Sequence, residues 1–582
     1  MPINIEEIED FLTIAFPESD RLIFESSRRI TGPGMIWDKR SALLDILVDG
    51  FEKSAVIAAW EIEIHRILAS LEWQESECAS RIFENGVTLL ISAPADLLYS
   101  AVFVIETSWH LAANTLLGEK PRDYDLLVSD LRDVIELEQN PALIKLQRAA
   151  DAKNLDILSD DDFVSLGHGT GSETWRVNSL PAPPNVDWGR LHNLPVALIT
   201  GTNGKSTSVR LATAIGEAAG LISGSTSTDY VKLGNDILDY GDYSGPGGAR
   251  MLLRDKRLEI AFLEVARGGI LRRGLPLFQA RAALVTNVAA DHLGQYGVNT
   301  VEALAVAKFA VARAVSKDGV LVLNADDPLV VVNGRLSDRS ICWFSLDAGN
   351  DLIAQSLLDR QACCWLHNKI IYYSDGAEIT LQLSVDDIPI TMAGAARFNI
   401  QNAMGAIGLA KAMGIGNAAI VTGLAEFSAS PEDNPGRCNE FMVRGARVFV
   451  DFAHNPHAIN AMSQLLENLP AKRKFLLISH AGDRSDSDIA ALTVGALGFG
   501  PDRVVISELE GYLRGRGMGE VPALLEKACL ALGVRPSHIT HVSSPSKGAE
   551  YILSELASGD VALILAMADR EQIFDLIRAE QN

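Results

Sequence analysis

The sequence of 582 residues is poor in basic side chains and has no long apolar run. Its 51 lysines and arginines stand against 75 acidic residues, which gives a net charge of −24. Proteins that bind nucleic acid need a cationic surface to displace counterions from phosphates. The longest apolar runs, such as Val561–Ala568, are far shorter than the roughly 20 residues that cross a bilayer. We therefore expect neither a nucleic-acid partner nor a membrane partner.

Signals for export and for cross-linking are also absent. The first residues contain no basic region followed by an apolar run, so the sequence predicts no signal peptide and a cytoplasmic protein. The six cysteines show no Cys-x-x-Cys pairing and no neighbouring histidines, which favours buried free thiols over disulfides or a zinc site. What remains is a folded chain with 48% apolar residues, long enough for about four domains at roughly 150 residues each.

Changes of pattern along the chain divide it. Residues 1–180 are acidic and rich in helical periodicity, with helices expected at residues 57–71 and 126–135 and a strand at 87–92, so we expect an α+β domain. The stretch Pro181–Pro184 predicts a linker, because proline removes amide donors and forces an extended backbone. We place the first domain boundary there.

Short apolar strands alternate with helices in residues 181–434, which is typical of parallel strands joined by crossover helices. Strands are expected at residues 196–200, 260–265, 282–287 and 319–324, and helices at 206–220 and 301–315. Residues 338–393 interrupt this series with alternating segments at 369–373 and 378–383, which we interpret as an antiparallel appendage on the same sheet.

A second α/β series occupies residues 435–582. Four strands separated by helices make a small doubly wound, Rossmann-like domain. They are expected at residues 448–451, 475–479, 503–506 and 561–565.

A glycine-rich loop lies between the first predicted strand and the first predicted helix of the central domain. In Thr200-Gly-Thr-Asn-Gly-Lys-Ser-Thr, Gly201 and Gly204 let backbone amides close around phosphate oxygens, and the Ser206 hydroxyl lies where it can reach Mg²⁺. The full Walker A spacing requires glycine at position 199, where this chain has Ile199, so the loop is a shortened variant. Taken alone, it fits a plain glycine turn with an exposed lysine equally well.

Together with four later motifs, this loop resembles the ATP-dependent amide ligases of the Mur ligase superfamily, in the same order along the chain. The later motifs are Glu264–Leu271, Asn287–Gly294, Leu323–Pro328 and Val450–His457. Further segments resemble one branch of that superfamily, the cyanophycin synthetase family, over roughly residues 181–582. They are Gly241–Pro246, Ala266–Arg272, Gly482–Ile489 and Leu513–Arg516. The resemblance implies a three-domain α/β fold: an α+β N-terminal domain, a central P-loop domain with a parallel sheet, and a Rossmann-like C-terminal domain.

The N-terminal region is similar to the N-terminal domain of the same family, more faintly, at Arg28–Trp37 and Asp162–Gly169. Cyanophycin synthetases carry an ATP-grasp domain between these modules, and here only the proline linker stands in its place. The resemblance therefore implies that this chain performs only the Mur-type step and that a separate ATP-grasp ligase is its partner. It also favours a homo-oligomer that associates through the central region.

The reaction that the resemblance implies is ATP-dependent amide synthesis. A carboxylate of a peptide or amino-acid polymer attacks the γ-phosphate of ATP, and the amine of an incoming amino acid then attacks the acyl phosphate. Two alternatives stay open. One is a Mur-type ligase that acts on a cell-wall or folate-like acceptor, and the other is a non-catalytic nucleotide-binding scaffold for an ATP-grasp partner.

The resemblance also assigns roles to residues. Those expected to bind the phosphates of ATP are Gly201, Thr202, Asn203, Gly204, Lys205, Ser206 and Thr207. Ser206 and Glu264 would bind a first Mg²⁺, and His292 and Lys308 a second. Many Mur ligases carbamylate the lysine that matches Lys308, which turns a cation into an oxygen ligand; a plain lysine on an amphipathic helix is the alternative. Lys205, Glu264, His292 and Lys308 form the expected catalytic set.

The remaining nucleotide contacts would come from two later segments. Asn399 resembles a residue that contacts adenine, and its alternative is a helix N-cap. Arg437, Asp451 and His454 match nucleotide contacts of the C-terminal domain, so catalysis should require that domain to close over the central one.

The substrate residues are less defined. The candidates are Thr226, Arg267, Asp483, Arg484, Arg514 and Arg516. Acidic groups there would suit a basic amino-acid donor, whereas the arginines would suit an acidic donor or acceptor, and the residues alone do not decide between them. The net charge of −24 favours a basic donor.

Overall fold

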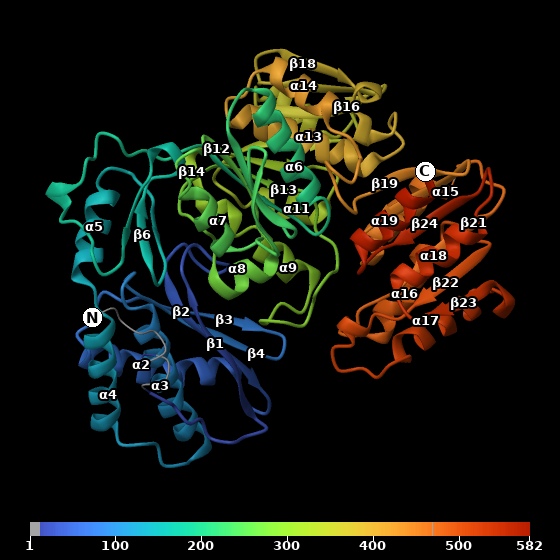
Figure 1. Cartoon of the computed structure of the whole chain (residues 1–582). Helices are drawn as coiled ribbons and strands as arrows, with labels where there is room; N and C mark the ends of the chain where they lie inside the picture. Colours follow the sequence, from blue (N-terminus) through green and yellow to red (C-terminus); the bar gives the residue numbers. More distant parts are fainter. Residues whose placement is uncertain (1–7, 9–11, 468, 582) are drawn as a thin grey trace.

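The computed structural model describes residue 8, residues 12–467 and residues 469–581. Figure 1 shows three parts in chain order, with the N-terminal part (blue) and the C-terminal part (orange to red) both lying beside the central part (green to yellow). The described strands form sheets of four, three, eleven and six strands. This is the mixed α/β architecture with parallel sheets that the sequence predicts.

The N-terminal part is built on an antiparallel sheet in the order β1-β2-β4-β3. Its elements are β1 (Leu22–Ile30), β2 (Ser41–Val48), α2 (Lys53–Ser70), β3 (Cys78–Phe83), β4 (Gly86–Ser92), α3 (Leu98–Leu117) and α4 (Tyr124–Glu138). The indoles of Trp60 and Trp109 are buried between the sheet and its helices. The sequence predicts α2, α4 and β4 but not β1, because polar residues such as Arg28 break its apolar pattern.

A small antiparallel sheet follows the first. It consists of β5 (Ile157–Ser159), β6 (Phe163–Leu166) and β7 (Glu173–Arg176), and it packs on α5 (Pro141–Asp151). Val186, beyond the proline stretch, belongs to the same apolar cluster as Leu146 and Leu166, so packing continues across residues 181–184. The division of the chain into residues 1–180, 181–434 and 435–582 stays a proposal.

The central part is organised by a sheet whose described strands run in the order β11-β10-β9-β12-β8-β13-β14-β15-β16-β17-β18. They are β8 (Val196–Thr200), β9 (Ser223–Thr226), β10 (Tyr230–Leu233), β11 (Asp236–Tyr240), β12 (Ile260–Glu264), β13 (Ala280–Val285), β14 (Val315–Asn324), β15 (Ser340–Ser345), β16 (Cys363–His367), β17 (Ile370–Ser374) and β18 (Ile379–Ser384). The stretch from β9 to β16 is parallel, and both ends of the sheet are antiparallel. Within residues 338–393, β15 and β16 continue the parallel series and β17 and β18 run antiparallel.

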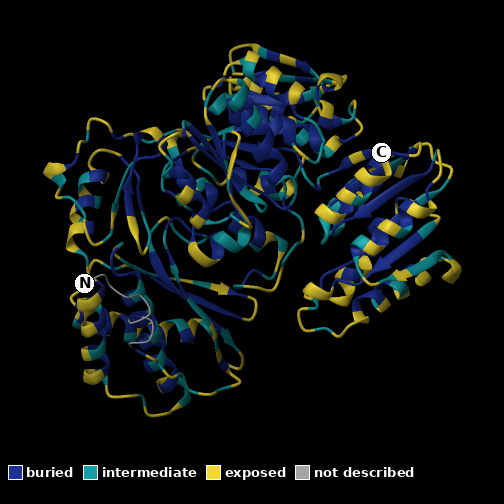
Figure 2. Ribbon diagram, in the orientation of Figure 1, coloured by how far each residue is buried: buried dark blue, intermediate teal, exposed yellow. Residues whose placement is uncertain are grey.

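Helices cover both faces of this sheet. One face carries α6 (Lys205–Ala218), α13 (Arg397–Ala412) and α14 (Asn417–Glu426). The other carries α7 (Pro246–Leu253), α8 (Arg267–Arg273), α9 (Val301–Lys308), α10 (Val311–Ala314), α11 (Pro328–Gly334) and α12 (Asp351–Leu358). The middle strands are therefore buried on both sides, as Figure 2 shows in dark blue. The helical stretch predicted over residues 301–315 is present as two helices, α9 and α10, since the helix breaks after Lys308, and it ends one residue earlier because Val315 begins β14.

The C-terminal part has a sheet of six described strands in the order β19-β20-β24-β21-β22-β23. They are β19 (Asn439–Val443), β20 (Ala446–Asp451), β21 (Lys474–Ile478), β22 (Arg503–Ser507), β23 (Ile539–Val542) and β24 (Val561–Leu565), with α15 (Pro456–Glu467), α16 (Asp486–Leu497), α17 (Glu520–Ala531), α18 (Pro545–Glu555) and α19 (Arg570–Gln581) around them. The four predicted parallel strands are present, and β23 and the antiparallel β19 extend the sheet at its edges. None of the described helices has both the length and the apolarity that a membrane span needs.

Candidate active site

The phosphate-binding loop of the central part joins β8 to α6. All five residues of β8 are buried, and the loop turns through Gly201 and Gly204, whose φ angles of 146° and 85° favour glycine. A Cβ atom on Gly201 would lie 1.9 Å from Oγ1 of Thr286, so a larger residue does not fit. Backbone amides of such a loop, together with the positive end of the following helix, bind anions.

The residues between the two glycines are tied to the loop after β13. The Thr202 hydroxyl donates a hydrogen bond to the Ala289 carbonyl at 3.0 Å, and the Asn203 amide donates to Oδ1 of Asn287 at 2.9 Å. The loop that follows β13 therefore supports the conformation of the phosphate-binding loop.

The first residues of α6 present the predicted phosphate and metal ligands. Nζ of Lys205 donates to the Thr202 carbonyl at 3.0 Å, which folds the lysine back over the loop. Oγ of Ser206 lies 3.5 Å from Oγ1 of Thr228. Both side chains are thus at the loop where the sequence places the phosphates of ATP.

Glu264 ends β12, the strand beside β8, in register with Ile199. Its side chain is buried, with 2% of the residue exposed, and neither carboxylate oxygen has a hydrogen-bond partner in the described chain. An unpaired buried carboxylate is strongly unfavourable unless a cation compensates it. A Mg²⁺ ion bound by Glu264 and the Ser206 hydroxyl would satisfy both oxygens, so these residues fit the implied metal.

Lys308 ends α9 and is buried, with 4% exposed. Its Nζ donates a hydrogen bond to the Gly201 carbonyl at 2.7 Å. Lys308 therefore reaches the phosphate loop from the face of the sheet that lies opposite α6. Burial lowers the pKa of Lys308 well below its ordinary value, and the charge of Lys205 lowers it further. This environment therefore favours the neutral amine form of Lys308 more than water does.

A second group of ligands forms where the central and C-terminal parts meet. One donor atom each from Asp291, His292 and His454 lies within 4.8 Å of the others. Partial burial lowers the pKa of His292 to about 4 against the pull of Asp291, so its imidazole is neutral, as a metal ligand must be. Burial acts to raise the pKa of Asp291, but the surrounding imidazoles and Arg484 outweigh it and hold that pKa far below its usual value.

The C-terminal part docks directly on the phosphate loop. The side chains of Asn203 and Asn455 exchange hydrogen bonds of 3.2 and 2.9 Å. Nδ1 of His457 lies 2.9 Å from the side-chain nitrogen Nδ2 of Asn203. Arg570 forms an ion pair with Asp229 at 2.7 Å. The described molecule therefore has its C-terminal part closed on the central part.

The other predicted nucleotide residues lie around this closed junction. Asp451 ends β20 and accepts hydrogen bonds from the Cys438 and Ala453 amides at 2.7 and 2.6 Å. The guanidinium of Arg437 lies 5.0 Å from the ring of Phe452. His454 points to the second ligand group, with Nε2 3.7 Å from Asp291.

Asn399 lies in the first turn of α13 and is buried, with 2% exposed. It donates to the Ile390 carbonyl at 3.0 Å and accepts from Asn402 at 3.1 Å. The alternative that Asn399 caps this helix is wrong, because the N-cap is Ala396.

The predicted substrate residues fall into two groups. The Thr226 hydroxyl is buried without a partner among the described atoms, and Arg267 at the start of α8 donates to Gln295 at 2.7 Å. The others are paired within the C-terminal part or across the junction: Asp483 with Arg514 at 2.5 Å, Arg484 with Asp291 at 2.7 Å, and Arg516 with Asp486 at 2.8 Å. Asp483 and Asp486, two of the carboxylates that could bind a basic donor, thus already pair with arginines of the chain.

Some residues of the site are missing from the sequence prediction. Asp291 directly precedes His292, and Asn455 directly follows His454, so both lie inside motifs that are already singled out. Arg570 lies outside every motif, and only the docking of the C-terminal part brings it to Asp229.

The fold and the site define an α/β protein with a P-loop at the C-terminal edge of a parallel sheet, a buried unpaired carboxylate beside it, and a Rossmann-like part that closes over both. Models of the Mur ligase middle domain and of the Mur ligase glutamate ligase domain match residues 199–410 and 436–567, together more than half of the chain. The chain belongs to the Mur ligase family.

Known relatives place it within that family. It is 35% identical over 373 residues to the cyanophycin synthetase of Crocosphaera subtropica, which covers 64% of this chain and 42% of the relative. It is 28% identical over 308 residues to the UDP-N-acetylmuramoylalanine–D-glutamate ligase of Chlorobium luteolum, covering 51% of this chain and 58% of that enzyme. The chain thus spans about two fifths of the cyanophycin synthetases that it matches.

A solved structure supports the fold. E. coli FolC in complex with DHPP and ADP matches 67% of this chain and 89% of its own, with a TM-score of 0.51 and 20% identity.

Proposed function

We propose that the protein is an ATP-dependent ligase that joins a carboxylate to an amine and releases ADP and phosphate. The observation that carries this proposal is the buried, unpaired Glu264 beside the phosphate loop, because such a carboxylate is stable only when a cation is bound next to it. The 35% identity to a cyanophycin synthetase favours a peptide or amino-acid polymer as acceptor over a cell-wall or folate-like acceptor or a non-catalytic scaffold.

Each part of the site has a role in this reaction. The loop amides and Lys205 hold the β- and γ-phosphates, and the acceptor carboxylate attacks the γ-phosphorus and displaces ADP. Ser206 and Glu264 would hold one Mg²⁺, and His292 and Lys308 a second; Mg²⁺ screens the charge that repels the attacking carboxylate. The amine then attacks the acyl phosphate, loses a proton and expels phosphate.

Closure of the C-terminal part positions the remaining groups. The bonds of Asn455 and His457 to Asn203 tie this part to the phosphate loop. Asn399, Arg437, Asp451 and His454 then serve as nucleotide contacts, and Thr226, Arg267, Asp483, Arg484, Arg514 and Arg516 as residues around the acceptor and donor. Such closure excludes water, which would hydrolyse the acyl phosphate.

The partners of the reaction follow from the same proposal. The amino-acid donor is basic, because the net charge of −24 attracts a cation. A separate ATP-grasp ligase supplies the backbone, and the protein works as a homo-oligomer in the cytoplasm, where ATP is available.

The proposal is tested by phosphate release from the purified protein with ATP, each of the twenty amino acids and aspartate-containing peptides. We expect release only when an acceptor carboxylate and a donor amine are both present. Lys205→Met is the matched inactive control, since it changes the loop lysine alone. Turnover that is the same with and without these substrates would contradict the proposal.

Carbamylation of Lys308 is a separate part of the proposal. In its neutral form Nζ would add to the carbon of CO₂ and lose a proton, and the oxygens of the resulting carbamate would be anionic ligands for the second Mg²⁺. We expect wild-type turnover to fall about tenfold when CO₂ and bicarbonate are removed, and a ¹³C carbamate signal to appear with labelled bicarbonate.

Lys308→Met should abolish that signal and the bicarbonate dependence. Lys411→Met is the matched control, because Lys411 is a half-buried lysine on α13 that contacts Asn417 away from the loop. A wild-type protein without the carbamate signal and with turnover independent of bicarbonate would show that Lys308 acts as a plain lysine.

A further inference from the structure

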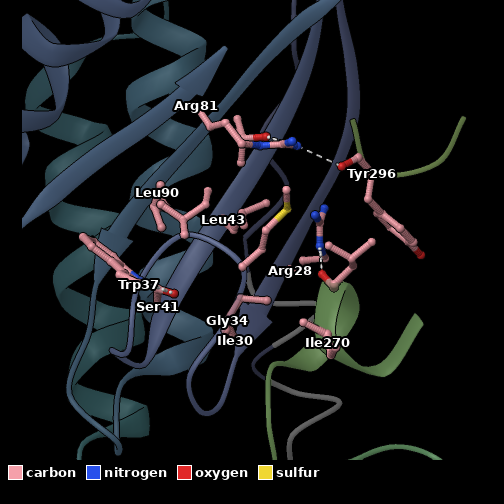
Figure 3. A pocket seen from close by; sticks show the side chains of 14 residues that line it. Arg28, Ile30, Gly34, Trp37, Ser41, Leu43, Arg81, Leu90, Ile270 and Tyr296 are labelled. Atoms are coloured by element: carbon pink, nitrogen blue, oxygen red, sulfur yellow. Dashed lines mark hydrogen bonds between the residues drawn. The ribbon is translucent and has the colours of Figure 1, made fainter. Parts of the chain in front are cut away.

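A short segment of the central part connects the N-terminal part to the active site, and we call it the junction loop (residues 291–298). This loop begins with Asp291 and His292, which belong to the second ligand group, and ends against the N-terminal sheet. Figure 3 shows the sheet on one side, with the short helix α8 and Tyr296 of the junction loop on the other.

Arg28 on β1 is the first anchor of this contact. It is buried, with 8% exposed, and its Nε donates to the Leu271 carbonyl of α8 at 2.7 Å. Its guanidinium also lies over the Tyr296 ring, 4.5 Å from the centroid. Arg28 thereby holds α8 and the junction loop at the same time.

Arg81 on β3 is the second anchor. Nη1 donates to the Gly297 carbonyl at 3.0 Å, and Nη2 donates to the Tyr296 carbonyl at 3.1 Å. Two adjacent carbonyls of the junction loop are therefore held by one planar guanidinium, which fixes their orientation as well as their distance.

A single buried carboxylate orients both arginines. Asp45 on β2 is fully buried, and one of its oxygens pairs with Arg28 at 2.6 Å. The other accepts a hydrogen bond from Thr88 at 2.7 Å, and Nη2 of Arg81 donates to the same threonine at 3.3 Å. The two anchors are thus linked through Asp45 and Thr88 in one hydrogen-bond network, which fixes the orientation of both guanidinium groups.

The junction loop needs such outside support. His292 and Tyr296 have φ angles of 50° and 55°, left-handed backbone that non-glycine residues seldom adopt without tertiary contacts. A Cβ atom on Gly297 would lie 2.6 Å from Nη2 of Arg81, so the loop packs closely on this anchor. Gln295 of the loop in turn accepts the hydrogen bond from Arg267.

Apolar and polar contacts meet at this junction. A shallow pocket there is lined by Trp37, Leu43 and Ile270 together with the two arginines (Figure 3). The hydrogen bonds of the arginines therefore cross the boundary beside an apolar contact between the sheet and α8.

We propose that Arg28 and Arg81 are positioning residues for the ligase site: they hold the junction loop so that Asp291 and His292 face the C-terminal part. The N-terminal part is then a support for the active-site loop. The consequence for catalysis rests on the proposed function, whereas the effect on the junction loop does not.

The test compares Arg81→Met with Arg21→Met in the full-length protein. Arg21 is a matched control, because it directly precedes β1, donates to the Gly50 carbonyl at 2.7 Å and lies 4.0 Å from the Phe51 ring, and no contact with the junction loop is recorded for it among the described residues. In hydrogen exchange, the amides of Gly294 and Val298, which are bonded within the loop, should exchange about tenfold faster in Arg81→Met and unchanged in Arg21→Met.

Turnover gives the second readout. Arg81→Met should raise the Mg²⁺ concentration for half-maximal turnover about tenfold and change the KM for ATP less than about twofold, because the phosphate loop itself is untouched. Arg81→Lys keeps the positive charge on a single nitrogen in place of the planar fork and should give intermediate exchange, and it carries the test if Arg81→Met does not fold.

Unchanged exchange of the junction loop in the Arg81 variants, or equal acceleration in Arg21→Met, would overturn the proposal. So would faster exchange with an unchanged Mg²⁺ requirement, because His292 would then not depend on the anchors. A wild-type protein without ATP turnover would refute the proposed function instead, and the exchange result would decide this inference.

Discussion

Glutamine in place of Glu264 is expected to reduce ATP turnover by about a thousandfold and, at the same time, to stabilise the ligand-free protein. Both effects have one cause, since the two oxygens of Glu264 are buried without a hydrogen-bond partner in the described chain. The charge is unfavourable until a cation is bound, so its removal should raise the free energy of unfolding of the ligand-free protein by about 1–3 kcal/mol. The same removal takes an anionic ligand from the metal.

Thermal unfolding with and without Mg²⁺ and an ATP analogue separates the two effects. The wild type should gain stability when both are added, and Glu264→Gln should start from a higher midpoint and gain little. Glu259→Gln is the matched control. Glu259 directly precedes the first residue of β12, whereas Glu264 is the last, and its carboxylate accepts a hydrogen bond from the Ile222 backbone amide at 2.8 Å. A Glu264→Gln protein that turns over ATP like the control would contradict the metal assignment.

The strands that build the site could be predicted from the sequence because their burial is complete. Residues 196–200 form β8 as expected, since all five are buried on both faces of a parallel sheet and form a short apolar run. Glu264 opens one of the motifs, whereas Lys308 could be singled out only through the resemblance to the Mur ligase superfamily. The hydrogen bond from Lys308 to the Gly201 carbonyl was not predicted.

What the sequence did not predict depends on contacts between parts that lie far apart in the chain. The strands β1 and β3 carry Arg28 and Arg81 toward another part, so their polar residues hide the strand pattern. The ion pair of Asp291 with Arg484 joins residues 193 positions apart, and no local spacing indicates it. Periodicity reports the burial of one element, and it carries no information on which element docks against it.

Asparagine in place of Asp291 is expected to lower kcat/KM by about a hundredfold and to open the C-terminal part. Asp291 of the central part pairs with Arg484 at 2.7 Å, and its other oxygen lies 3.7 Å from His454. Both partners come from the C-terminal part, and the side chains of Asp291 and Arg484 are only 11% and 13% exposed, so solvent screens the pair weakly. Loss of the carboxylate leaves the largely buried Arg484 beside Arg267 without its counter-charge.

A double-mutant cycle with Arg484→Met measures the pair itself, with an expected coupling on the order of 2 kcal/mol in kcat/KM. Asp486→Asn is the matched control, because Asp486 also pairs with an arginine at 2.8 Å but is 67% exposed, and exposed pairs contribute less than about 1 kcal/mol. X-ray scattering with an ATP analogue should show a larger radius of gyration for Asp291→Asn and for Arg484→Met than for the control. If Arg484 instead binds the donor, Arg484→Met should raise the KM for the amine alone, with no coupling to Asp291 and no change in scattering. The two readouts therefore decide whether Arg484 closes the domains or recognises the amino acid.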